Sequence, residues 1–405
     1  MPEWNSFRRV KAVFNGDLPD KVPKYEGSIE IKELNPIQDG QAAPQALIFF
    51  PTQAVSIFHS FPPLLTLVKK LISKPQLFNL PARIAIKLVS ELQRRYNYDI
   101  FAFAGGLPMI FSERLFRDFH TEERNRVIRN RKGRLIWKTS LEGAHVRKGF
   151  MDEVTDWDKY IEFDSDHPGN YILMNGAVRT SRKLDIVPMY SLYGAVGFEE
   201  ICGAFGLEKT FKFLMEEKNF IRKITKDMND YAVASAEGVL QRGGKYFYIT
   251  SDLGVKERSM ISPRMFKEFF KPGLKRFCSR VHRLGGKVML HACGYVQNLI
   301  PDFIDARIDA LHPIESAAGN DIMKIKKEFG KNLILVGNVP IPLLTHGTPK
   351  ETYNYVKYLL ANISKDGGHI ISSSHSVTQW CDVRNFLAYY KAVEDHGKYP
   401  ITVTV

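Results

Sequence analysis

Residues 245–252 read KYFYITSD and residues 287–293 read KVMLHAC, and these two runs decide the fold. Each is a short apolar run, rich in β-branched or aromatic residues, that ends abruptly in polar, ionisable side chains. Between them, residues 264–284 carry apolar positions at helical spacing and stop at Gly285–Gly286, which is a helix-ending signal. A strand, a polar turn and a helix in this order form one βα unit of a parallel sheet.

The same unit recurs towards the end of the chain, and upstream segments supply further strands. The eight expected strands are residues 22–29, 98–103, 185–193, 245–251, 287–290, 308–311, 333–336 and 369–371. Eight βα units in 405 residues predict an α/β protein of one domain, a (β/α)8 TIM barrel over residues 1–405. The polar residues that follow the strands are then expected to meet at one end of the barrel, where active sites lie.

Residues 104–180 interrupt this rhythm and are interpreted as an insertion within the N-terminal half. Within them, Arg131–Arg134 reads RKGR and is flanked by β-favouring residues, which predicts a hairpin turn. The expected architecture is therefore a barrel with an N-terminal helical and β-hairpin elaboration.

The chain is basic, with a formal net charge of +13, and residues 121–150 alone contain nine Lys or Arg against three Glu. This cluster is either a solvated face or a docking surface for an acidic partner, and it resembles no nucleic-acid-binding module. No apolar run is long enough for a membrane span, and residues 1–9 do not resemble a signal peptide. We therefore expect a cytoplasmic protein whose four cysteines are reduced thiols.

The His291-Ala292-Cys293-Gly294 element is the sharpest chemical signal. Side chains at positions i and i+2 of an extended segment point the same way, so His291 and Cys293 can reach one metal ion. The alternative is a structural histidine beside a small buried cysteine. His375 follows the last strand and is a candidate third ligand, or else a substrate contact.

Polar residues also follow other predicted strands, and we expect them to lie at the same end of the barrel as His291. Asp252 is a candidate for acid–base catalysis or substrate binding, or a plain turn cap. Glu315, in the run HPIE, is a weaker catalytic candidate, and Asn338 and Tyr193 are assigned to substrate binding. Cys202 and Cys381 are interpreted as packing residues.

Taken together, several motifs resemble the uroporphyrinogen-decarboxylase-like superfamily along almost the whole chain. The matching segments are Gly16-Asp17-Leu18-Pro19-Asp20, Asp252-Leu253-Gly254 with Ser262-Pro263-Arg264-Met265-Phe266, His291-Ala292-Cys293-Gly294, His346-Gly347-Thr348-Pro349 and Gly397-Lys398-Tyr399-Pro400. The decarboxylases of this superfamily carry an arginine-rich segment after the first strand, whereas residues 25–30 here read YEGSIE. The resemblance therefore favours the methyltransferase branch, which holds zinc with His-x-Cys and a later Cys.

In this sequence His291 and Cys293 match the first two zinc ligands, and His375 stands where the third ligand is a cysteine. The resemblance implies zinc on these three residues and a corrinoid (cobalamin) carried by a partner protein. Its best match is an O-demethylase that moves the methyl group of a methoxylated aromatic compound to a Co(I) corrinoid. Aromatic residues of Ala46–Phe111 are either walls of the methoxyarene pocket or core.

Three alternatives stay open at this stage. A methylcobalamin:coenzyme M-type methyltransferase uses the same ligands but is disfavoured by the loss of the third cysteine. A barrel without catalysis is disfavoured by the retained cluster of Asp252, His291, Cys293 and His375, and a uroporphyrinogen decarboxylase is disfavoured by the absence of arginine in residues 25–30. A protonated histidine is the expected proton donor where no metal is present. The superfamily resemblance also admits a homodimer.

Overall fold

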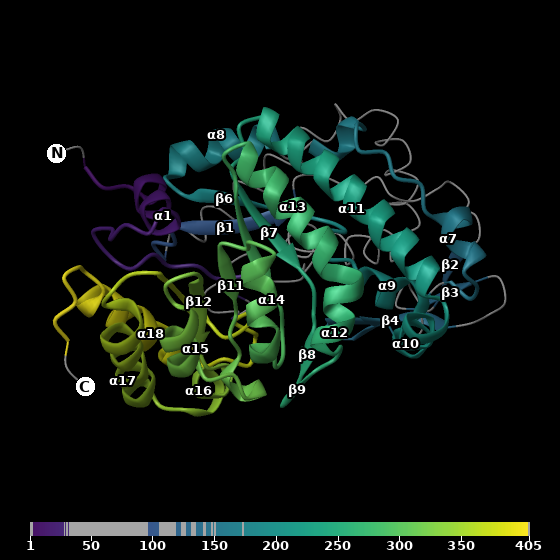
Figure 1. Cartoon of the computed structure of the whole chain (residues 1–405). Helices are drawn as coiled ribbons and strands as arrows, with labels where there is room; N and C mark the ends of the chain where they lie inside the picture. The colour runs from purple at the N-terminus through teal and green to yellow at the C-terminus, as the bar shows by residue number, and fades with distance from the viewer. Residues whose placement is uncertain are drawn as a thin grey trace.

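Figure 1 shows the computed structural model of the chain. The structure describes residues 3–27, 29, 31, 96–104, 119–122, 127–130, 135–140, 143–146, 149, 151–171 and 174–403. The basic side chains of residues 121–150, and the aromatic residues of Ala46–Phe111 outside 96–104, lie outside this part of the chain. The interpretations of those two regions stay predictions.

A seven-stranded, fully parallel sheet is the centre of the molecule, as the sequence rhythm predicted. In spatial order its strands are β1 (Ile100–Ala104), β6 (Val187–Leu192), β7 (Tyr246–Thr250), β10 (Lys287–His291), β11 (Ala310–His312), β12 (Ile334–Val339) and β13 (His369–Ser373). Neighbours in the sheet follow one another along the chain, which is the order of a βα barrel.

The barrel is closed by two residues of the N-terminal segment. Lys24 forms a parallel bridge to Ile371 in β13, and Tyr25 forms one to Ile100 in β1. The amide of Tyr25 donates to the carbonyl of Ile371 at 3.0 Å, and the amide of Asp99 donates to the carbonyl of Lys24 at 3.0 Å. This segment takes the place of the eighth strand, so the predicted (β/α)8 barrel is confirmed.

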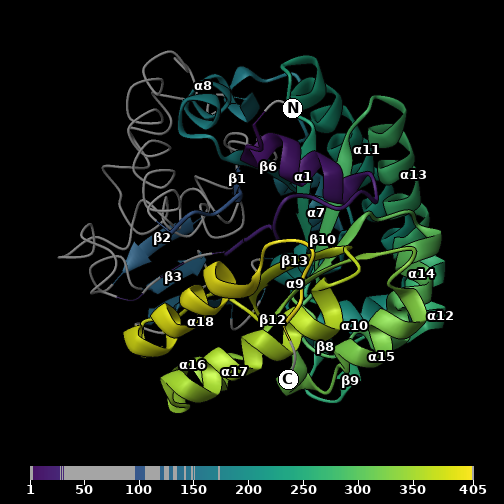
Figure 2. The same ribbon diagram turned by 90° about the vertical axis from the view of Figure 1, so that its left-hand side faces the viewer.

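Helices follow the strands and surround the sheet. They are α1 (Ser6–Phe14), α7 (Thr155–Tyr160), α8 (Met174–Leu184), α9 (Phe198–Phe205), α10 (Leu207–Glu216), α11 (Lys218–Gln241), α12 (Pro263–Met265), α13 (Lys271–Arg283), α14 (Ile300–Asp305), α15 (Ile322–Phe329), α16 (Ile341–His346), α17 (Pro349–Leu359) and α18 (Val383–His396). Figure 2 shows α11, α13 and α14 on one side, and α17 and α18 on the other. Helices α10 and α11 are separated at Glu217, whose backbone leaves the helical region.

A second, antiparallel sheet lies in the expected insertion. Its strands are β2 (Phe119–Glu122), β3 (Val127–Asn130), β4 (Leu135–Ser140) and β5 (Gly143–Val146), in that spatial order. The antiparallel pair β3–β4 flanks residues 131–134, as predicted from the RKGR run. The limits of the insertion, and the assignment of the whole chain to one domain, stay predictions.

A buried ion network ties the closing segment to the barrel. The guanidinium of Arg9 in α1 pairs with Asp20 (Nε–Oδ1 2.7 Å) and with Asp99 (Nη1–Oδ1 2.5 Å). The carboxylate of Asp99 also accepts the hydroxyl of Ser6 at 2.9 Å and the amide of Lys24 at 3.0 Å. Since Arg9 and Asp99 are almost fully buried, this network joins α1, the closing segment and β1 at one place.

Within the described residues, no helix combines the length and the apolar character that a membrane crossing requires.

Candidate metal centre

Three potential metal ligands meet at the carboxyl end of the barrel. His291 is the last residue of β10, Cys293 follows two positions later, and His375 lies in the loop after β13. One ligand atom of each residue lies within 4.8 Å of the others. Strands β10 and β13 are not neighbours in the sheet, so barrel curvature brings His375 to the other two. The geometry expected from the sequence is therefore present.

A tight backbone contact sets the position of Cys293. Gly294 ends the extended run with φ +75°, and a Cβ atom there would lie 2.2 Å from the backbone carbon of Gly254. A Cβ atom on Gly254 would lie 2.5 Å from the amide nitrogen of Tyr295. The turn after β7 and the turn after β10 thus touch through two glycines, and a side chain at either position would separate them.

We expect Gly294→Ala to lower the free energy of unfolding by at least about 2 kcal/mol, because alanine is strained at this φ and strikes fixed backbone atoms. Bound zinc should fall as well, since Cys293 must move. Urea denaturation and metal analysis measure the two effects. Gly203→Ala is the matched control: this glycine lies inside α9 with no atom near the new Cβ, so a gain of about 0.5–1 kcal/mol is expected. A stable, fully loaded Gly294→Ala protein would contradict the role of this contact.

Hydrogen bonds order the protons around His291. The thiol of Cys293 lies 2.9 Å from Nε2 of His291, and Nδ1 of His291 lies 2.7 Å from Nδ1 of His312. Nε2 of His312 lies 3.4 Å from the hydroxyl of Ser372. Burial lowers the pKa of His291 to about 4 and the pKa of His312 well below its usual range, so both rings are neutral. Two opposite arrangements of protons satisfy these contacts. A metal on Nε2 of His291 selects the one in which Nε2 carries no proton: the thiol donates to Nε2, His291 donates from Nδ1, and His312 donates from Nε2.

His312 is a further candidate residue of the site, and the sequence reasoning missed it. It ends β11 and lies in register with His291 across the β10–β11 pair. With a metal on Nε2 of His291, Nδ1 of His291 carries the proton and donates to Nδ1 of His312, which is the usual support of a metal-binding histidine. The signal was available in the sequence, because His312 follows its strand as His291 follows the strand before.

We expect His312→Ala to weaken zinc binding about 10–100-fold, because His291 loses the partner that fixes its ring. Competition with a chelator of known affinity measures the change. His369→Ala is the matched control, since His369 is also a fully buried histidine on a barrel strand but bonds Ser364 and Gly337. Equal losses of zinc in the two variants would show that His312 acts only through stability.

Carboxyl groups line one edge of the cluster. Asp252, half-exposed after β7, places Oδ1 3.7 Å from Nε2 of His291 and also contacts the thiol of Cys293. Burial is the main cause that raises the pKa of Glu199 in α9 well above its usual range, and repulsion from the carboxylate of Asp252 is the second cause. Burial, together with the nearby carboxyl groups of Asp252, Glu315 and Glu199, raises the pKa of the Cys293 thiol well above its usual range. Glu199 was not among the sequence candidates, because nothing in a helix start indicates contact with a distant strand end.

The other predicted residues lie at different distances from this cluster. Glu315 accepts the amide of Gly294 at 3.1 Å and so supports the turn that carries Cys293. Tyr193 is buried near Glu199 and Glu200, and burial raises the pKa of its phenol. Asn338 is fully buried and donates to the carbonyl of Ile314 at 3.0 Å. Their roles in substrate binding and catalysis stay predictions.

Aromatic rings form the floor of the site. The ring of Tyr248 lies 5.7 Å from that of His291, and Tyr25 meets His312 edge-on at 5.3 Å. Tyr25 is one of the two residues that close the barrel, so closure and site are packed together. Burial raises the pKa of both phenols, which keeps them uncharged.

The donor set fits zinc. Two imidazole nitrogens and one thiolate sulfur are the ligands that zinc prefers, and three protein ligands leave a fourth position for another group. Nitrogen and sulfur on one tetrahedral zinc stand roughly 3.5 Å apart. Separations of 2.9 Å and up to 4.8 Å are within about 1.5 Å of that value, so rotations of the side chains suffice. A metal held here would replace the thiol proton and leave the contact of His291 with His312 intact.

The fold and the site define an α/β barrel with a His-x-Cys and His cluster at its carboxyl-terminal mouth. Residues 136–396 match the sequence profile of uroporphyrinogen decarboxylase (URO-D), which covers more than half of the chain. The chain therefore belongs to the uroporphyrinogen decarboxylase family. No curated protein matches the sequence significantly.

Solved structures share the fold to different degrees. A methyltransferase from Methanosarcina mazei superposes with a TM-score of 0.62 at 18% identity, over 97% of this chain and 99% of its own. A 3-keto-D-glucoside 4-epimerase from E. coli gives a TM-score of 0.33 at 10% identity, over 54% of this chain and 82% of its own. The first likeness shows a common fold over nearly the full length of both chains, and the second is too weak to support an argument.

Proposed function

We propose that this protein is a methyltransferase that moves the methyl group of a methoxylated aromatic compound to the Co(I) corrinoid of a partner protein. The observation that carries the proposal is the convergence of His291, Cys293 and His375 at the carboxyl-terminal mouth of the barrel. The full-length likeness to a methyltransferase supports this branch of the family. The absence of arginine in residues 25–30 weighs against decarboxylation of a substrate rich in carboxylates.

In the proposed reaction the methyl group leaves an ether oxygen and joins cobalt. The Co(I) centre supplies the electron pair of the new carbon–cobalt bond, and the pair of the broken carbon–oxygen bond leaves with the aryl oxide. The aryl oxide is the difficult leaving group, so the enzyme must stabilise negative charge on oxygen. Zinc, when bound by His291, Cys293 and His375, would supply a Lewis acid for this oxygen.

The residues around the cluster then have defined tasks. His312 holds the ring of His291, and the paired glycines hold the turn that carries Cys293. Asp252 is half-exposed beside His291 and is placed to orient the substrate at the mouth. The sequence-derived expectation of a protonated histidine donor does not suit His291, because its pKa of about 4 leaves the ring neutral near pH 7.

The partner must bring its corrinoid to the same mouth. The net charge of +13 favours an acidic partner and fast association at low salt. A homodimer is compatible with this arrangement and is a separate expectation.

The test is a methyl-transfer assay on the purified protein with free Co(I) cobalamin. Loss of the Co(I) absorbance and growth of the methylcobalamin spectrum with a methoxybenzoate are expected, together with one equivalent of the phenol. A second arm offers methylcobalamin and coenzyme M, and a third measures carbon dioxide release from uroporphyrinogen. Turnover in the second or third arm without turnover in the first would overturn the proposal in favour of the corresponding activity.

A further inference from the structure

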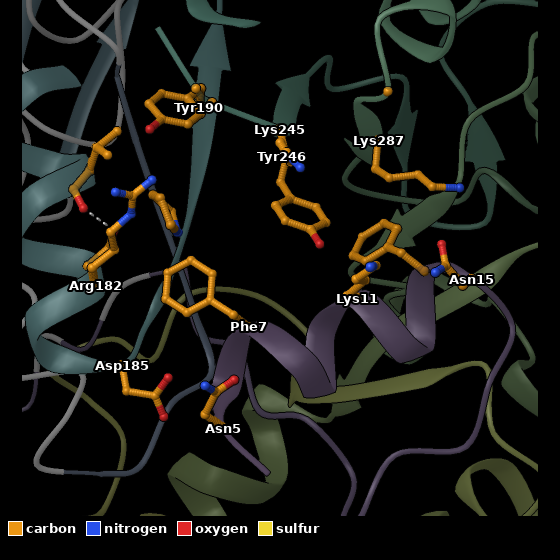
Figure 3. A pocket seen from close by; sticks show the side chains of 17 residues that line it. Asn5, Phe7, Lys11, Asn15, Arg182, Asp185, Tyr190, Lys245, Tyr246 and Lys287 are labelled. Atoms are coloured by element: carbon orange, nitrogen blue, oxygen red, sulfur yellow. Dashed lines mark hydrogen bonds between the residues drawn. The ribbon is translucent and has the colours of Figure 1, made fainter. Parts of the chain in front are cut away.

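A cavity of about 570 Å³ opens at the opposite end of the barrel from the candidate metal centre. It lies between α1, α8 and the first residues of β6, β7 and β10 (Figure 3). Lys287 at the start of β10 lines the cavity, whereas His291 at the end of the same strand carries the metal ligand. Four residues of a strand span roughly 13 Å, so the cavity and the metal centre are separate places.

The lining of this cavity is strongly positive. Lys11, Arg182, Lys245 and Lys287 all contribute to it, and the single carboxylate among its described lining residues is Asp185. That carboxylate already accepts the amide of Ser6 at 3.1 Å. Such an excess of cations around one hollow attracts anions and disfavours neutral or cationic ligands.

The cations differ in how far they are already neutralised. Nζ of Lys287 lies 3.1 Å from Oδ1 of Asp309 and forms an ion pair with it. Lys11, Arg182 and Lys245 form no ion pair with any described residue. Because three positive side chains around one cavity have no acidic partner among the described residues, the cavity favours an anionic ligand.

Aromatic rings occupy the middle of the cavity wall. Phe7 of α1 and Tyr246 of β7 are half-buried and line it, and Phe14 packs against Tyr246 with ring centroids 5.3 Å apart. Figure 3 shows the rings of Phe7 and Tyr246 between Arg182 on one side and Lys11 and Lys287 on the other. A planar ring can therefore lie against these side chains while its charged groups reach the cations.

From these observations we infer that the amino-terminal end of the barrel binds a phosphorylated small molecule with a planar ring, of the nucleotide class. The volume lies within the range of about 300–1,000 Å³ that holds small ligands, and the concave shape does not suit a flat protein surface. Lysine and arginine are the side chains that recognise phosphate, and aromatic faces stack on nucleobases. The inference is independent of the reaction proposed for the other end.

Isothermal titration calorimetry on the full chain tests the site with three probes: ADP, inorganic pyrophosphate and adenosine. We expect ADP to bind, pyrophosphate to bind more weakly, and adenosine to bind very weakly. The double variant Lys11→Ala/Lys245→Ala should weaken ADP binding about 100-fold, or about tenfold for each lysine. Phe7→Leu, which keeps α1 packed, should weaken ADP but leave pyrophosphate unchanged.

The control is Lys327→Ala/Lys350→Ala, which removes the same charge from exposed positions outside the cavity. This variant should bind ADP like the unaltered protein, and the methyl-transfer activity should survive in all of these variants. No ADP binding at millimolar concentration, or equal losses in the two double variants, would overturn the inference. Equal affinity for ADP and pyrophosphate, unaffected by Phe7→Leu, would overturn the part that concerns the ring.

Discussion

Replacement of His291 by alanine is expected to remove nearly all bound zinc and to lower the methyl-transfer rate by more than about 1,000-fold. His291 supplies one of three clustered ligands, and loss of a ligand should exceed the roughly 10–100-fold cost of losing a residue that merely supports one. Metal analysis by mass spectrometry after dialysis measures the stoichiometry, and the Co(I) cobalamin assay measures the rate.

The matched control for this variant is His282→Ala. His282 lies on α13 and pairs with Asp309 at 2.7 Å, and Asp309 accepts the amide of Val288 at the start of β10, the opposite end of that strand from His291. This variant should keep about one zinc per chain and its activity. Equal zinc contents in the two variants would eliminate the metal centre, whereas zinc loss without loss of methyl transfer would separate the metal from the reaction.

The second large effect is expected at the barrel seam. Asp99→Ala should lower the free energy of unfolding by about 3–5 kcal/mol, because it leaves the buried guanidinium of Arg9 with Asp20 alone. The hydroxyl of Ser6 and the amide of Lys24 lose their acceptor in the same step. Urea denaturation followed by circular dichroism measures the change.

Glu328→Ala provides the comparison for that variant. Glu328 faces Lys324 at 4.0 Å on an exposed helix, so its loss should cost less than about 0.5 kcal/mol. If Asp99→Ala unfolds at the same urea concentration as Glu328→Ala, the network does not hold the barrel closed.

The parallel strands could be predicted because each one is an apolar run followed by a polar turn. Buried strands such as β7 and β10 leave this pattern in any sequence, whatever their partners. The segment 22–29 was also predicted, but among the described residues it pairs through isolated bridges: Lys24 and Tyr25 bridge to the barrel strands, and Ile29 bridges to Val377. The number of residues that pair in such a segment depends on its register with the strands on both sides. The local pattern of apolar and polar residues does not contain that register.

The candidate ligands could be predicted because residues at strand ends converge whichever barrel they belong to. His312 follows its strand and so carried the same signal, although only the strand register shows that it contacts His291. Glu199 carried no such signal, because its contact with the site is set by helix packing. Asn338 shows the converse, since a residue at the end of β12 lies fully buried and bonds the chain beside it. Position at a strand end therefore selects candidates, and only the three-dimensional contacts assign their surroundings.

The seam between Lys24 and β13 has a consequence for synthesis on the ribosome. Ile371 is made roughly 350 residues after its partner, which takes about 20–70 s at typical translation rates. Throughout that interval the nascent chain holds an open sheet, and His375 has not yet emerged to complete the ligand set. A polypeptide that ends before this point would lack both the bridge that seals the barrel and the third proposed ligand, so zinc loading at the proposed site would have to follow synthesis of the last strand.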